Sequence, residues 1–108
     1  MRISALWPVV STVLAIGQPA LAQQLPGDPA AGLALARAQC SECHYVEREW
    51  ADLQVMFAPD FVDIAASDHS EVSLKVFLRT PHVTMPNIIL TDEQRDNVVA
   101  YILSLKEK

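Results

Sequence analysis

Apolar residues recur every three or four positions in several stretches of the chain, which is the spacing of an amphipathic helix. The first stretch predicts a helix from Pro29 to about Cys40, because Asp28 is a good N-cap and proline suits the first helical position. One face of this helix is built of small or apolar residues that let a second helix approach closely, namely Gly32, Leu33 and Ala36.

Three further helices are predicted towards the C-terminus. A short helix begins at Pro59, and a longer one covers about Glu71–Arg79 and stops before Pro81. The last helix begins after Thr91, which forms a capping box with Gln94. The positions predicted to face inward on these helices are Phe61, Ile64 and Ala65, then Leu74, Phe77 and Leu78, then Val98, Tyr101, Ile102 and Leu105.

The segment Tyr45–Ala58 shows no clear period, and it is predicted to be a loop that holds about one turn of helix. No strand-like alternation, internal repeat or low-complexity tract occurs along the chain. A chain of 108 residues is long enough for one domain. We therefore predict an all-α fold of three to five helices, in a single domain over residues 23–108.

The first 22 residues are predicted to be a secretory signal peptide. Arg2 is their only charge, an apolar run follows, and Ala20–Ala22 supplies a small-x-small cleavage site. The alternative is an uncleaved membrane anchor, because the stretch is just long enough to cross a bilayer. We favour cleavage because Gly17 and Pro19 break the apolar run, and we expect a mature chain that starts at Gln23 and works in a bacterial periplasm.

Composition and charge narrow the class of protein. Hydrophobic residues make up 51% of the chain, which excludes disorder. Without residues 1–22 the chain carries 7 basic and 13 acidic residues, a formal charge of −6. An acidic chain with no basic run binds nucleic acid poorly, so no nucleic-acid partner is expected. A domain of this size gains stability from a bound cofactor.

The motif that carries chemistry is Cys40-Ser41-Glu42-Cys43-His44, which is the Cys-x-x-Cys-His signature of covalent c-type haem attachment. Two thiols three residues apart lie on adjacent faces of a helical turn, where they can form thioethers to the two vinyl groups on one haem edge. The following imidazole can then project under the iron. Because such attachment normally requires export, the signal peptide supports it independently.

Other chemistry is possible for a Cys-x-x-Cys pair. A thiol–disulfide active site usually accompanies a βαβ pattern, and none is visible. A structural zinc site needs more ligands than one cysteine pair, and the chain has no second pair. We therefore expect one covalent haem c, with its iron held by His44.

Four residues are candidates for the sixth iron ligand, namely Met56, Met85, His69 and His82. Met85 is favoured, because Pro81 and Pro86 bracket its loop and stiffen it, and the 41 residues from His44 are ample to reach the opposite haem face. His82 is the main competitor, although a solvent-facing loop histidine is the simpler interpretation. His69 is expected to be exposed in a polar turn, and Met56 to pack against the haem or core.

With these residues, the chain over Asp28–Lys106 resembles the small class I c-type cytochromes of bacteria, which wrap an all-α fold around one haem. The resemblance implies contact between Gly32 on the first helix and Tyr101 on the last. It also implies a hydrogen bond from His44 to the carbonyl of Pro59, in a segment where Pro59 and Phe61 match the family's Gly-Pro-x-aromatic pattern. This chain departs from that pattern in having Ala58 before the proline.

Trp50 lies in a segment that matches no family pattern. We assign it to the haem site, where it would cover a haem edge or donate its Nε1–H to a propionate, and a packing tryptophan is the alternative.

The resulting functional prediction is a periplasmic one-electron carrier and not an enzyme. Its partners are expected to be redox proteins with basic docking patches, it meets membranes only through membrane-bound redox complexes, and it is expected to be a monomer. Three alternatives stay open: a dedicated haem subunit of a periplasmic dehydrogenase or reductase, a ligand-binding or sensor haem protein with Met85 off the iron, and a haem-free thiol oxidoreductase.

Overall fold

The structure is a computed structural model that describes residues 25–53 and 58–106, together with positions 4, 8, 9 and 17. The predicted leader, residues 1–22, therefore lies almost wholly outside the described residues. Within the described part, no helix is long and apolar enough to cross a membrane.

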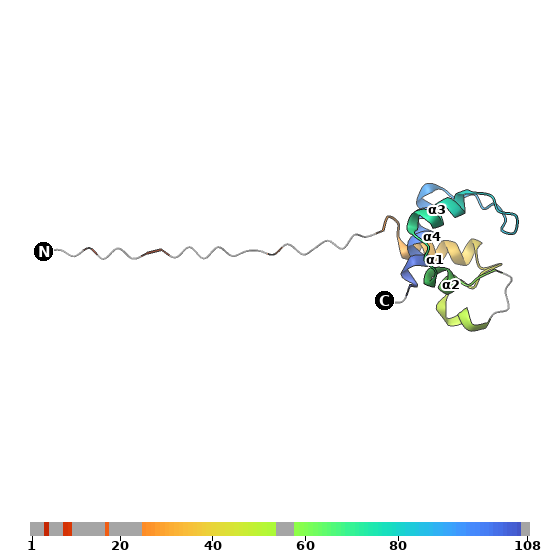
Figure 1. Ribbon diagram of the computed structural model, residues 1–108, viewed down its shortest axis with the longest axis horizontal. Coiled ribbons are helices and arrows are strands. Elements are labelled where there is room, and N and C mark those ends of the chain that lie inside the picture. The colour runs from red at the N-terminus through yellow and green to blue at the C-terminus, as the bar shows by residue number, and fades with distance from the viewer. Residues whose placement is uncertain (1–3, 5–7, 10–16, 18–24, 54–57, 107–108) are drawn as a thin grey trace.

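Five helical elements follow one another along the chain, and no strand occurs among the described residues (Figure 1). The α-helices are α1 (Pro29–Gln39), α2 (Phe61–Ala66), α3 (Glu71–Arg79) and α4 (Asp92–Ser104), and a 3₁₀ helix, η1 (Arg48–Leu53), lies between α1 and α2. The predicted all-α class is confirmed, and η1 supplies the turn of helix expected between Tyr45 and Ala58.

The helix ends form where the sequence places its caps. The Asp28 side chain accepts from the amide of Ala30 at 2.9 Å, and Pro29 opens α1. At the start of α4, the Thr91 hydroxyl accepts from the amide of Gln94 at 3.1 Å, while the Gln94 side chain accepts from the Thr91 amide at 2.9 Å. This reciprocal box satisfies two amides that would otherwise lack partners at the helix end.

One boundary differs from the prediction, because α2 begins at Phe61 and not at Pro59. Asp60 is the N-cap residue and has an extended backbone. The carbonyl of Pro59, which precedes it, accepts a hydrogen bond from the His44 ring. The helix therefore starts two residues later than the proline alone suggests.

The packing of α1 against α4 is the largest interface between elements, and α4 also contacts α2 and α3. Gly32 sits at the crossing, where a Cβ would collide with the carbonyl oxygen of Asn97 and come within 2.8 Å of the Tyr101 Cβ. Nearby, the Asp28 amide donates to the Asn97 side chain at 2.8 Å. The predicted contact between Gly32 and Tyr101 is thus present.

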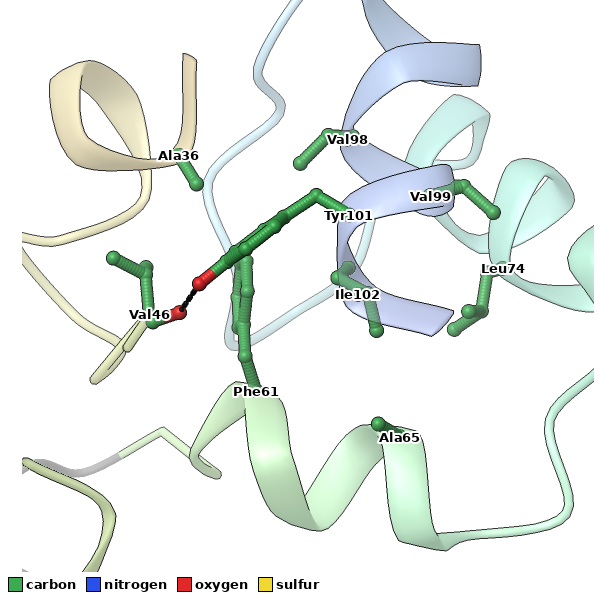
Figure 2. Close-up of a cluster of buried hydrophobic side chains, with 9 residues drawn as sticks. All are labelled: Ala36, Val46, Phe61, Ala65, Leu74, Val98, Val99, Tyr101 and Ile102. Carbon is green, nitrogen blue, oxygen red and sulfur yellow. Dashed lines mark hydrogen bonds between the residues drawn. The ribbon is translucent and has the colours of Figure 1, made fainter. Parts of the chain in front are cut away.

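The core lies around α4 (Figure 2). Its buried members are Ala36, Val46, Phe61, Ala65, Leu74, Val98, Val99, Tyr101 and Ile102. The Tyr101 hydroxyl donates to the backbone carbonyl of Val46, which ties the segment after the cysteine motif to α4. Phe61 lies beside Tyr101, with 6.4 Å between the ring centroids, so α2 joins the same core.

Phe77 is an exception to the predicted inward face of α3. Leu74 is buried and Leu78 is partly buried, whereas the Phe77 side chain is 44% exposed. It stacks on a histidine of the following loop instead of joining the core.

Candidate functional site

The cysteine motif forms a turn at the end of α1. Cys40 is the C-cap residue, and its carbonyl accepts from the amides of Cys43 at 3.2 Å and His44 at 3.0 Å. The two thiols therefore sit on one compact turn, as the spacing predicts. Cys40 is partly buried and Cys43 is exposed. Burial raises the pKa of the Cys40 thiol, since it disfavours the thiolate.

His44 has one ring nitrogen fixed by the backbone. Its Nδ1 lies 2.7 Å from the carbonyl oxygen of Pro59. A carbonyl can only accept, so Nδ1 carries the proton and the lone pair of the neutral ring is on Nε2. Nε2 is the atom that a metal ion would use, and the bond at Nδ1 both orients the ring and raises its basicity.

The segment that holds the Pro59 carbonyl is itself anchored. The Phe61 amide donates to the Tyr45 carbonyl at 3.0 Å, and the Phe61 ring lies 5.3 Å from the His44 ring with the planes tilted by 55°. Because Phe61 is buried against Tyr101, the orientation of His44 is connected to the α1–α4 core.

Two cavities meet at the cysteine motif. The larger has a volume of about 340 Å³ and is lined by Ala38, Gln39, Cys40, Glu42, Cys43, His44, Met85, Pro86 and Ile88. The smaller is about 20 Å³, and Phe77 and His82 line it. Four residues line both, namely Cys40, Met85, Pro86 and Ile88. The fold thus brings His44 and Met85 to one cavity although Met85 lies 41 positions after His44 in the sequence.

These residues fit a c-type haem. The large cavity presents two thiols on one turn, an imidazole with its Nε2 lone pair available and a soft thioether from another segment. The remaining lining is mostly apolar, from Ala38, Pro86 and Ile88, and such a lining suits a porphyrin ring.

The other candidate ligands are placed differently. His82 does not line the large cavity; its Nε2 donates to the carbonyl of Phe77 at 3.1 Å and its ring stacks on Phe77. His69 is exposed in the turn before α3, as predicted. Met56 lies outside the described residues.

Trp50 is not brought to the cavities. Its side chain is 52% exposed on η1, and neither cavity includes it. Pro59 and Phe61 also lie outside the lining, and they bear on the site through the orientation of His44.

Sequence reasoning missed several lining residues. Ala38 and Gln39 belong to the last turn of α1, Glu42 lies within the motif, and Pro86 and Ile88 follow Met85. These residues are close in sequence to the cysteine motif or to Met85. That closeness predicts that they lie near the site, but it does not predict which of their side chains face the cavity.

Taken together, a small all-α domain with a single Cys-x-x-Cys-His turn facing an apolar cavity defines a monohaem c-type protein. The sequence profile of the cytochrome c family matches residues 29–106, so the chain belongs to the cytochrome c family. It is 34% identical over 83 residues to cytochrome c-552 of Bradyrhizobium diazoefficiens, a match that covers 76% of this chain and 79% of the relative. No solved structure matches the chain significantly.

Membership establishes the cofactor and the general role. The chain binds one covalent c-type haem with its iron and serves as a haem-based electron carrier. Proteins of this family generally transfer electrons and are not enzymes, and bacterial members are typically periplasmic or secreted.

Proposed function

We propose that the chain is a periplasmic one-electron carrier whose haem is attached through Cys40 and Cys43 and whose iron is held by His44 and Met85. The observation that carries the proposal is the shared cavity, which both residues line from distant parts of the chain. When bound, the haem supplies a one-electron couple between ferric and ferrous iron.

The protein's own residues support this role in three ways. Each thiol would add its S–H across one vinyl group, a reaction that needs no oxidant. His44 is held in one tautomer by the Pro59 carbonyl, so its Nε2 needs no reorganisation to bind a metal ion. Met85 would contribute a neutral thioether, which favours ferrous iron and raises the reduction potential.

Phe61 supports the same arrangement by packing beside the imidazole. Its ring packs 5.3 Å from His44 and is itself buried, so the imidazole has little freedom to turn. A ligand that does not move between oxidation states keeps the reorganisation small, as a carrier requires. A bond from Trp50 to a propionate stays a prediction, because neither cavity includes Trp50.

Surface charge supports a basic redox partner. Four cations pair with acids of the same chain: Arg37 with Glu47, Lys75 with Glu71 and Asp96, and Arg79 and Arg95 with Asp92. Exposed carboxylates remain at Glu42, Glu49, Asp63, Asp68 and Glu93. Of these, Glu42 also lines the large cavity, so negative charge lies where a partner would approach the haem.

The test is an optical spectrum of the protein expressed with its leader in a bacterium that attaches haem c. Sharp c-type bands on reduction, with a weak far-red sulfur-to-iron band on oxidation, are expected for ligation by His44 and Met85. Haem bands without the far-red band would exclude Met85 as the ligand. Recovery in the cytoplasmic and not the periplasmic fraction would exclude the proposed location.

A further inference from the structure

We propose that His82 is a positioning residue, which clamps the loop that carries Met85 onto the end of α3. The inference rests on the proposed function, in which the Met85 thioether binds the iron. It assigns His82 a role other than ligand or solvent-exposed loop residue.

The clamp consists of two contacts between His82 and Phe77. The two rings stack with centroids 3.7 Å apart and planes 17° from parallel. The His82 Nε2 also donates to the carbonyl oxygen of Phe77 at 3.1 Å. One side chain therefore holds both the ring and the backbone of the same residue in the last turn of α3.

The loop begins at the C-terminal end of α3, where the carbonyls of Val76 and Phe77 accept hydrogen bonds from Thr80 and His82. The Thr80 amide donates to the Phe77 carbonyl at 3.2 Å, and the Thr80 hydroxyl donates to the Val76 carbonyl at 2.7 Å. Pro81 follows and has no amide hydrogen to donate. Thr80 and His82 thus satisfy carbonyls that the helix end leaves without intrahelical partners.

Met85 follows the clamp after only two residues. Val83 and Thr84, which lie between, are exposed, so they do not anchor the loop in the core. Figure 1 shows the segment between α3 and α4 extending away from the helices. His82 and Phe77 line the smaller cavity together with Met85, so the clamp and Met85 border the same space.

The same geometry separates His82 from the ligands. A carbonyl acceptor requires a proton on Nε2, and a protonated nitrogen has no lone pair for a metal ion. To bind iron through Nε2, His82 would have to leave both the stack and the carbonyl. The residue that sequence alone marks as Met85's competitor is instead placed to hold Met85.

The experiment measures how often Met85 leaves the iron. Ferric holoprotein is mixed with imidazole, which can bind the iron only after Met85 has left it. At saturating imidazole the observed binding rate therefore reaches a limit set by the departure of Met85. This limiting rate is recorded for wild type, His82→Ala, His82→Phe and His69→Ala. His82→Phe can retain the stack but loses the donor. His69→Ala removes a histidine that is exposed in a turn and serves as the matched control.

We expect His82→Ala to keep the far-red band and to raise the limiting rate about tenfold, since it loses both a stack and a hydrogen bond. His82→Phe should fall between Ala and wild type, and His69→Ala should equal wild type. A His82→Ala rate equal to wild type would overturn the clamp while leaving Met85 ligation intact. A wild-type protein without the far-red band would refute Met85 ligation, and the clamp with it.

Discussion

The backbone of Gly32 on α1 lies directly against Tyr101 on α4, close enough that a Cβ at position 32 would come within 2.8 Å of the Tyr101 Cβ. The same Cβ would collide with the backbone carbonyl of Asn97, which cannot move aside as a flexible side chain can. The two helices therefore cross at a distance that only glycine allows. Tyr101 of α4 also packs against Phe61 and donates its hydroxyl hydrogen to the Val46 carbonyl. The crossing of α1 and α4 therefore supports the segments that position the site.

Gly32→Ala is expected to destabilise the protein even though alanine is the better helix former. Forcing a methyl group into a packed crossing costs about 1–3 kcal/mol or more, which exceeds the gain of about 1 kcal/mol in helix propensity. Denaturant unfolding of holoprotein would measure the change in the free energy of unfolding. Ala34→Ser, at an exposed position on the same helix, is the control. A stable Gly32→Ala variant would show that the helices cross farther apart than described.

Tyr101→Phe removes one hydroxyl from the core and leaves the Val46 carbonyl without that donor. An unsatisfied buried polar group costs about 1–3 kcal/mol, so we expect a loss of that order in the free energy of unfolding. Tyr45→Phe, which changes a partly buried tyrosine outside the core cluster, is the matched control. Equal effects of the two substitutions would contradict a special role for the Tyr101 hydroxyl.

The same tyrosine predicts a pH dependence. Burial raises the pKa of Tyr101 above its usual 10.0, and the charge of Glu47 adds to the effect. Above about pH 10 the unfolded chain loses the phenolic proton while the folded chain retains it, so stability falls as pH rises. The stability difference between wild type and Tyr101→Phe should therefore shrink above pH 10. Lys75, whose pKa is raised by Asp96 and Glu71, titrates in both proteins and cancels in the difference. A constant difference would refute the raised pKa.

The features predicted from sequence depend on contacts between near neighbours or on a strict motif. Asp28 and Thr91 cap helices through atoms two or three residues away, so local sequence determines them. The turn from Cys40 to His44 is likewise local. The long-range bond between His44 and Pro59 was implied by the family resemblance and not by any pattern in the residues, and the structure contains it.

Phe77 shows why the rest could not be predicted. Helical spacing places it on the same face as Leu74, but the face turned towards the core is narrower than the apolar stripe. Its actual neighbour, His82, is fixed by the path of the loop after Pro81, which depends on how the whole segment returns to α4. Spacing alone cannot give that path. Trp50 is similar, because its segment has no period and its exposure depends on how η1 packs on α2.

Met85→Ala tests directly whether Met85 is the sixth ligand. Loss of the thioether should abolish the far-red band, lower the reduction potential and let the reduced protein bind carbon monoxide at neutral pH. Met56→Ala is the matched control, since it removes another methionine considered as a ligand. If Met56→Ala abolished the band and Met85→Ala did not, the assignment of the two methionines would be reversed.

The last prediction concerns the negative surface charge. Two small redox complexes, one cationic and one anionic, can test it even though the physiological partner is not known. Reduced protein should be oxidised by the cation tris(phenanthroline)cobalt(III) at a rate that falls as salt rises, and by the anion ferricyanide at a rate that rises. The reason is that exposed charges are screened beyond about 10 Å at 0.1 M ionic strength. Glu42 lines the large cavity, so Glu42→Gln should weaken the salt dependence for the cation more than Glu93→Gln, which removes an equal charge away from the cavity. Equal slopes for the two variants would mean that net charge alone acts, and salt-independent rates would show that the carboxylates do not steer partners to the haem.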